Sequence, residues 1–191
     1  DISITFLVFH VPNDKPTNVT SYIESQSRQL DPTRITFVTL PPLVNPCDTC
    51  SPYMADLHLP IVKKAIQGLN KKPAAIILDT MNSPLTDVAI ELDIPSYIYF
   101  PSAVAILYLH LHVQALADEK GLDGLSALVA DPENTQLDLP GFRNHLPVKV
   151  FPGVFLEKDN EFTSVYIHIG RKFRQSKGII VHSVMEFESV T

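Results

Sequence analysis

The residue best placed for chemistry is an aspartate that directly follows a short apolar run. Residues 74–78 read Ala-Ala-Ile-Ile-Leu, and Asp79 comes next. A continuous apolar run of this length is typical of a strand buried on both faces of a parallel sheet, and ligands of such sheets bind beyond the carboxyl ends of the strands. A carboxylate there can hold a histidine and stabilise its protonated form. A structural role is also open, in which Asp79 caps a helix that begins near residues 82–84.

The histidines offer weaker candidates. His110 and His112 fall in one expected helix, where a spacing of two places them on different faces, so they cannot bind one metal ion together. Either one could line a pocket and bind a ligand hydroxyl, or fill the core or its rim. His10 ends the first apolar run, but the turn that follows it contains no glycine, which favours a structural role.

Cys47 and Cys50 form a single C-x-x-C. A zinc site needs a second pair or histidines at fixed spacing, and a thioredoxin-like motif needs a preceding strand and a following helix, so we expect neither. Two cysteines provide no disulfide framework, which indicates a reducing compartment and a cytoplasmic location. The tripeptide Asn18-Val19-Thr20 matches a glycosylation sequon, a match that is common by chance.

The sequence lacks the loop motifs that define three classes of enzyme. The sequence holds 7 glycines and contains no G-x-G-x-x-G, no G-x-x-x-x-G-K-[ST] and no G-x-S-x-G. A Rossmann dinucleotide site, a P-loop NTPase and an esterase-type hydrolase are therefore disfavoured.

Apolar patterning predicts strands that alternate with helices. The expected strands cover residues 2–9, 34–40, 74–78, 96–100 and 178–182. The expected helices cover residues 18–30, 57–69, 84–92, 102–119 and 161–173, with Ser102 as an N-cap. This alternation predicts an α/β domain with a parallel sheet, flanking helices and one compact core.

Composition and charge exclude further classes of protein. The chain has 191 residues, of which 45% are hydrophobic, and 15 Lys+Arg against 21 Asp+Glu give a net charge of −6. An acidic chain without basic runs lacks the footprint of a nucleic-acid binder, and no run approaches the roughly 18 apolar residues of a membrane-spanning helix. The chain starts at Asp1 without a methionine and enters a strand-like run at once, so we expect a fragment of a longer protein.

The order of four segments resembles the N-terminal, acceptor-binding half of plant family 1 UDP-glycosyltransferases. The segments are residues 74–79 (AAIILD), 87–103 (DVAIELDIPSYIYFPSA), 139–142 (LPGF) and 173–188 (FRQSKGIIVHSVMEFE). Residues 139–155 are most similar to the branch that glycosylates flavonoids and other small plant phenols or terpenoids. The resemblance implies a GT-B fold, in which two Rossmann-like domains face each other across a cleft and this chain is most of the first.

The resemblance also implies a mechanism. In the family an N-terminal histidine removes a proton from the acceptor hydroxyl, and an aspartate at the position of Asp79 pairs with that histidine while the sugar C1 is inverted. The first strand of this chain resembles the family's second strand, and His10 does not match the catalytic histidine. The resemblance therefore implies that residues 1–191 are an incomplete N-terminal domain, inactive alone, without the strand of the catalytic histidine and without the C-terminal donor domain.

Further site residues follow from the resemblance. Counting from Asp79 and from residue 100 places Met81, His110 and Phe162 on the acceptor wall, with the loop 41–53 at its border. Where many relatives carry a threonine near the donor sugar this chain has a proline at position 101, which leaves Ser102 as the nearest hydroxyl.

We therefore expect part of a UDP-sugar-dependent inverting O-glycosyltransferase. It would transfer a hexose, glucose by expectation, to a small hydrophobic plant metabolite such as a flavonoid or phenol, with the UDP-sugar as co-substrate and without a metal, membrane insertion or an obligate protein partner. The alternative is a non-catalytic Rossmann-like module that binds a small molecule, in which Asp79 only caps a helix.

Overall fold

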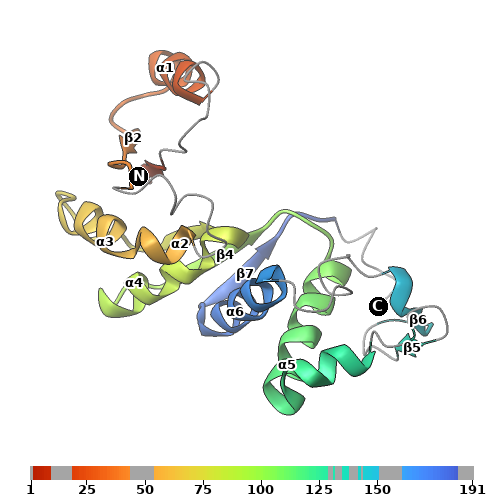
Figure 1. Cartoon of the computed structure of the whole chain (residues 1–191). Helices are drawn as coiled ribbons and strands as arrows, with labels where there is room; N and C mark the ends of the chain where they lie inside the picture. The colour runs from red at the N-terminus through yellow and green to blue at the C-terminus, as the bar shows by residue number, and fades with distance from the viewer. Residues whose placement is uncertain are drawn as a thin grey trace. The chain divides into compact units, whose positions relative to one another are not determined.

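The structure of the chain is a computed structural model that describes residues 2–9, 19–43, 54–128, 131, 135–137, 142, 144–150 and 161–184. Its contacts divide the chain into two compact units, residues 1–72 and residues 73–191 (Figure 1). This differs from the expected single core.

The first unit is built on two parallel strands. Strand β1 (Ile4–Val8) pairs with β2 (Ile35–Thr39), and helix α1 (Val19–Gln29) connects them. Helices α2 (Met54–Leu57) and α3 (Leu59–Gln67) follow. The single helix expected over residues 57–69 is thus two helices, and α3 starts with Pro60 in its first turn, where the missing N–H of proline costs nothing.

Strand β1 is less buried than its apolar sequence predicts. Ile4 and Phe6 are 46% and 47% exposed, and the ring of Phe6 stacks on that of Phe37 with centroids 5.1 Å apart. The prediction of a largely buried strand over residues 2–9 is therefore wrong for β1 in this structure. Cross-strand stacking covers only one side of the Phe6 ring, and the residue remains exposed.

The second unit is built on three parallel strands with β4 in the middle. The order is β3 (Ile76–Asp79), β4 (Ser96–Phe100) and β7 (Gly178–Val181). Side chains alternate between the faces of a sheet, and the face with Leu78, Ile98 and Phe100 is buried. The ring of Phe100 meets Phe173 of helix α6 (Glu161–Gln175) edge to face, so α6 covers this face (Figure 1).

The helices of the second unit differ from the predicted ones in where they begin and end. The helix expected over residues 84–92 is a 3₁₀-helix, η2 (Thr80–Leu85), followed by α4 (Thr86–Glu91). Helix α5 (Val104–Leu128) is longer than expected and contains a break at Gly121, whose φ is +71°. The predicted N-cap at Ser102 is wrong, because the carbonyl that accepts the first N–H groups of α5 belongs to Ala103.

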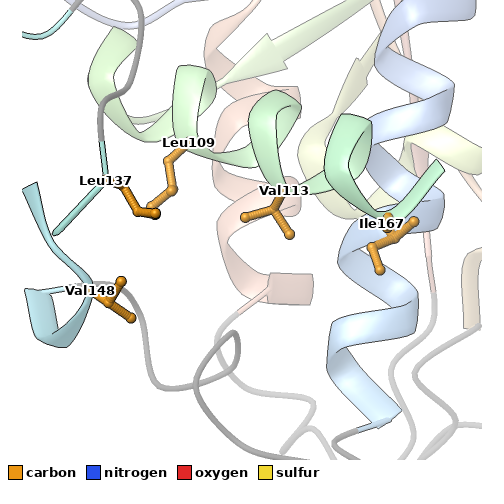
Figure 2. Packing of buried hydrophobic residues seen from close by; sticks show 6 residues of the cluster. Leu109, Val113, Leu137, Val148 and Ile167 are labelled. Carbon is orange, nitrogen blue, oxygen red and sulfur yellow. The ribbon is translucent and has the colours of Figure 1, made fainter. Parts of the chain in front are cut away.

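Helices α5 and α6 pack against each other and share a hydrophobic core cluster. Two short strands, β5 (Gln136–Leu137) and β6 (Leu146–Pro147), pair with each other, and the 3₁₀-helix η3 (Val148–Val150) follows β6. Residues four apart on α5 form an apolar stripe that packs with Ile167 of α6 and with buried residues of β5 and η3 (Figure 2). The buried members are Leu109, Val113, Ala117, Leu137, Val148 and Ile167. Their burial provides hydrophobic stabilisation that holds the two helices together.

An ion pair connects α6 to α4. Lys172 donates from Nζ to both carboxylate oxygens of Asp87 at 2.7 and 2.8 Å, and the lysine is almost fully buried. A buried ammonium needs such a partner, because burying it alone would be costly. The pair therefore fixes how α6 lies against α4, on the buried side of the sheet.

Candidate functional site

Asp79 is the last residue of β3 and caps the helix that follows. Its Oδ1 accepts hydrogen bonds from the backbone N–H groups of Met81 at 2.8 Å and Asn82 at 3.3 Å, and its Oδ2 accepts from the Asn82 side-chain amide. The structural role that the sequence left open is thus confirmed. A carboxylate has room for about four hydrogen bonds, and Asp79 is exposed, so capping holds the carboxylate still without enclosing it.

Two further polar side chains lie at the same edge of the sheet. Tyr99 is the register partner of Asp79 on β4, and its hydroxyl lies 2.6 Å from Nδ1 of His182, the residue after β7. The backbone N–H of His182 donates to the carbonyl of Phe100 at 3.0 Å, which extends the ladder beyond β7. Asp79, Tyr99 and His182 therefore stand on adjacent strands at their carboxyl ends.

Sequence reasoning missed the pair of Tyr99 and His182. The rule that singled out Asp79, a polar residue directly after a buried strand, applies equally to His182, which follows Val181. Tyr99 has no such signal, because it sits within an apolar run and only the register of β4 against β7 brings it to the histidine.

The expected acceptor residues occupy different environments. Met81 is 47% exposed on η2, and Phe162 is 51% exposed at the second position of α6, a helix that packs against η2. Ser102 is half-buried between β4 and α5. Their shared role at an acceptor wall stays a prediction, since no contact in the structure tests it.

His110 is 3% exposed and lies between α5 and α6. Its Nε2 lies 2.6 Å from the carbonyl oxygen of Tyr166, and its ring is 5.0 Å from those of Tyr166 and Phe173. Burial lowers the pKa of His110, against the opposing effect of the hydrogen bond to the Tyr166 carbonyl, so the imidazole is held neutral and donates from Nε2. The structure thus shows the packing role for His110, and its acceptor role stays a prediction.

Several candidate residues lie outside the described residues. They are His10, Cys47, Cys50, most of the loop 41–53, most of residues 139–155 and residues 186–188. In the part of the chain that the structure describes, no three His, Cys, Asp or Glu side chains gather as a metal site would require. No described helix is long and apolar enough to cross a membrane.

The first unit contains an apolar hollow of about 550 Å³. It is lined by Pro41, just after β2, and by residues of α3: Pro60, Ile61, Lys64 and Ala65. This volume falls within the range of small-molecule sites. One residue of the expected loop border, Pro41, thus lines a hollow that could admit an apolar group.

Known proteins resemble this chain along almost its whole length. A putative UDP-glucose flavonoid 3-O-glucosyltransferase 3 of Fragaria ananassa is 32% identical over 97% of this chain, and UDP-glycosyltransferase 71A15 of Malus domestica is 33% identical over 97% of it. The chain belongs to the plant UDP-glycosyltransferases. It spans about 40% of the length of these two relatives, 40% and 41% respectively. No family model matches the chain.

Solved structures of plant UDP-glycosyltransferases share its fold. The UGT71G1 structure of Medicago truncatula, complexed with UDP-glucose, is 26% identical with a TM-score of 0.73 and matches 96% of this chain and 40% of its own. A UDP-glycosyltransferase of Siraitia grosvenorii in complex with UDP is 27% identical with a TM-score of 0.69 and matches 97% of this chain and 43% of its own. The expected α/β class with parallel strands and flanking helices, as in one part of a GT-B fold, is confirmed.

Proposed function

We propose that this plant UDP-glycosyltransferase chain forms the acceptor-binding part of an inverting O-glycosyltransferase. The substrates we propose are a UDP-hexose, UDP-glucose in the first instance, and a small hydrophobic plant metabolite such as a flavonoid or phenol. Relatives carry the names flavonoid 3-O-glucosyltransferase and anthocyanidin 3-O-glucosyltransferase, and the Medicago truncatula structure is complexed with UDP-glucose. The observation that carries the proposal is Asp79, an exposed carboxylate oriented at the carboxyl edge of a parallel sheet.

The proposed step is a displacement at the sugar C1. A histidine supplied from outside these residues removes the proton of the acceptor hydroxyl, whose oxygen forms the new bond to C1 as the bond from C1 to the UDP oxygen breaks. Asp79 accepts a hydrogen bond from the other ring nitrogen of that histidine, which fixes its tautomer and stabilises the imidazolium. UDP leaves, and the configuration at C1 is inverted. The step draws on no metal.

The cap explains why Asp79 suits this role. Two backbone N–H groups and the Asn82 amide hold the carboxylate, so it loses little freedom when a histidine approaches. Asp79 is therefore positioned before any ligand arrives.

The remaining site residues complete the proposal. Met81, Phe162 and His110 would contribute to the acceptor wall, and Ser102 would lie near the donor sugar. An exposed thioether and an exposed aromatic ring suit a flat aromatic acceptor, because such ligands are recognised mainly by apolar contact. We propose the cytoplasm as the site of the reaction and small molecules as its partners.

The test uses the full-length protein, since this chain spans about 40% of the relatives. Transfer from UDP-glucose is measured against a panel of flavonols for wild type, Asp79→Asn and Asp79→Ala. We expect kcat to fall about 10²- to 10⁴-fold in both variants, as for loss of an orienting carboxylate. Asparagine keeps a side-chain oxygen for the cap, so Asp79→Asn separates the charge from the fold.

Asp31→Asn is the matched control. Asp31 is likewise exposed and accepts a backbone hydrogen bond two residues on, from Thr33 at 2.9 Å. We expect its turnover to equal that of wild type. Unchanged turnover in Asp79→Asn would overturn the catalytic role, and a wild-type protein that binds flavonols without transferring sugar would favour the non-catalytic binding module.

A further inference from the structure

The pair of Tyr99 and His182 is the polar group at the sheet edge that the proposed reaction does not use. Their side chains meet at 2.6 Å between the phenol oxygen and Nδ1, with ring centroids 6.0 Å apart. They come from positions 83 residues apart in the chain and are joined by the register of β4 against β7. His182 is exposed, and among the described residues the side-chain hydrogen bond to Tyr99 engages only Nδ1.

The pairing sets the proton positions of His182. A phenol is a better hydrogen-bond donor than acceptor, whereas the unprotonated nitrogen of a neutral imidazole is a strong acceptor. Tyr99 therefore donates to Nδ1, and the ring proton of neutral His182 is placed on Nε2. The pair thus presents an N–H donor to solvent at the edge of the sheet.

The donor lies on the same face of the sheet as Asp79. Register partners on parallel strands point to the same face, as Asp79 does with Tyr99 and Tyr99 does with Ile180. His182 lies two residues beyond Ile180 and shares its face. Strands β3 and β7 are two strand spacings apart, and His182 lies two residues further along than Ile180, so the Cα atoms of Asp79 and His182 are roughly 12 Å apart.

We infer that the Tyr99–His182 pair is a specificity-determining contact for the acceptor and binds a second oxygen of the molecule whose hydroxyl reacts near Asp79. This inference rests on the proposed function. A separation of roughly 12 Å, part of which is occupied by the histidine that pairs with Asp79, leaves room for an aromatic acceptor that carries a reacting hydroxyl at one end and a carbonyl or hydroxyl oxygen at the other. His182 donates from Nε2 to that second oxygen, and Tyr99 positions the imidazole.

The test measures acceptor affinity in the full-length protein without UDP-sugar. Two probes are titrated by calorimetry, a dihydroxylated flavone and its analogue without the distal hydroxyl. We expect His182→Ala to weaken binding of the first about 2- to 10-fold, the effect of one hydrogen bond, and to leave the second unchanged. Tyr99→Phe deletes one oxygen and should weaken binding of the dihydroxylated flavone by a smaller factor. It replaces His182→Ala as the test variant if that protein does not fold.

Tyr97→Phe is the matched control, because it removes a phenol hydroxyl on the same strand and face without a hydrogen bond to a histidine in the described structure. Its affinities should equal those of wild type. Equal affinity changes for both probes, or no change in either, would overturn the inference. A wild-type protein that transfers no sugar would overturn the proposed function instead. The two failures can be distinguished, because the binding measurement does not depend on turnover.

Discussion

A single residue, Asp79, combines a structural role with the chemical role that we propose for it. Asp79 ends a strand, caps η2 through the Met81 and Asn82 N–H groups and still presents its carboxylate at the surface. The two interpretations of Asp79 that the sequence left open are therefore compatible. Replacing the aspartate by alanine would remove the cap and the proposed catalytic role together, which is why the charge-only change to asparagine is the informative variant.

His110 makes stability depend on pH. Burial lowers the pKa of His110 below the usual 6.5. As the pH falls below about 6.5, His110 therefore binds a proton more readily in the unfolded chain than in the folded chain. The free energy of unfolding should therefore fall as the pH drops from 7.5 to 5.5, and fall less in His110→Phe. Denaturant titrations at each pH measure both.

His112 is the control for that experiment. Burial also lowers the pKa of His112, partly opposed by the charge of Glu119, so His112→Asn should remove the separate contribution of His112 to the pH dependence. An unchanged pH dependence in His110→Phe would show that the imidazole is not held neutral.

At the scale of elements, the crossing of α5 and α6 depends on a glycine. A Cβ added to Gly170 would lie 2.8 Å from Cβ and 3.0 Å from Cγ of Gln114 on α5. Gly170→Ala should therefore destabilise the protein by about 1–3 kcal/mol through overpacking, measured as the free energy of unfolding.

Gly68→Ala is its counterpart. A Cβ on Gly68 would meet only the carbonyl oxygens of Ala65 and Lys64 at 3.5 Å, and its φ of −79° suits any residue. We expect its stability to be equal to or slightly above that of wild type. A Gly170→Ala protein as stable as Gly68→Ala would mean that the helices can separate at little cost.

The sequence predicts elements better than their ends. Residues 96–100 form a strand as predicted, because alternate side chains pack on one face. The start of η2 at Thr80 escaped prediction, since it depends on hydrogen bonds to a side chain that also belongs to a strand. The start of α5 at Val104, beyond Ser102, depends on where the backbone leaves β4, which no local pattern reveals.

At the scale of the whole molecule, stability is distributed unevenly over the second unit. Strand β4 has a partner on each side and a fully buried Ile98, whereas β5 and β6 each contain two residues. Amide protons of β4 should therefore exchange with solvent at least about tenfold more slowly than those of β5 and β6, measured by hydrogen-exchange mass spectrometry. Equal rates would show that the unit opens as a whole.

The candidate site shows the limit of prediction at this scale. Asp79 becomes a candidate from its position alone, because the carboxyl edge of a parallel sheet is where ligands bind. The contact of Tyr99 with His182 was not predicted, because it requires the register of strands 83 residues apart. The exposure of Ile4 on β1 was also missed, since an apolar sequence does not state which neighbour covers it.

The alternation of side chains along β4 also bears on directed evolution. Ile98 and Phe100 point to the packed face, while Tyr97 and Tyr99 share the other face with Ile180 of β7. A library randomised at 99, 180 and 182 would therefore sample the acceptor preference that we propose while leaving the packed face intact. Inserting or deleting one residue in β4 would instead exchange the two faces and lose both at once.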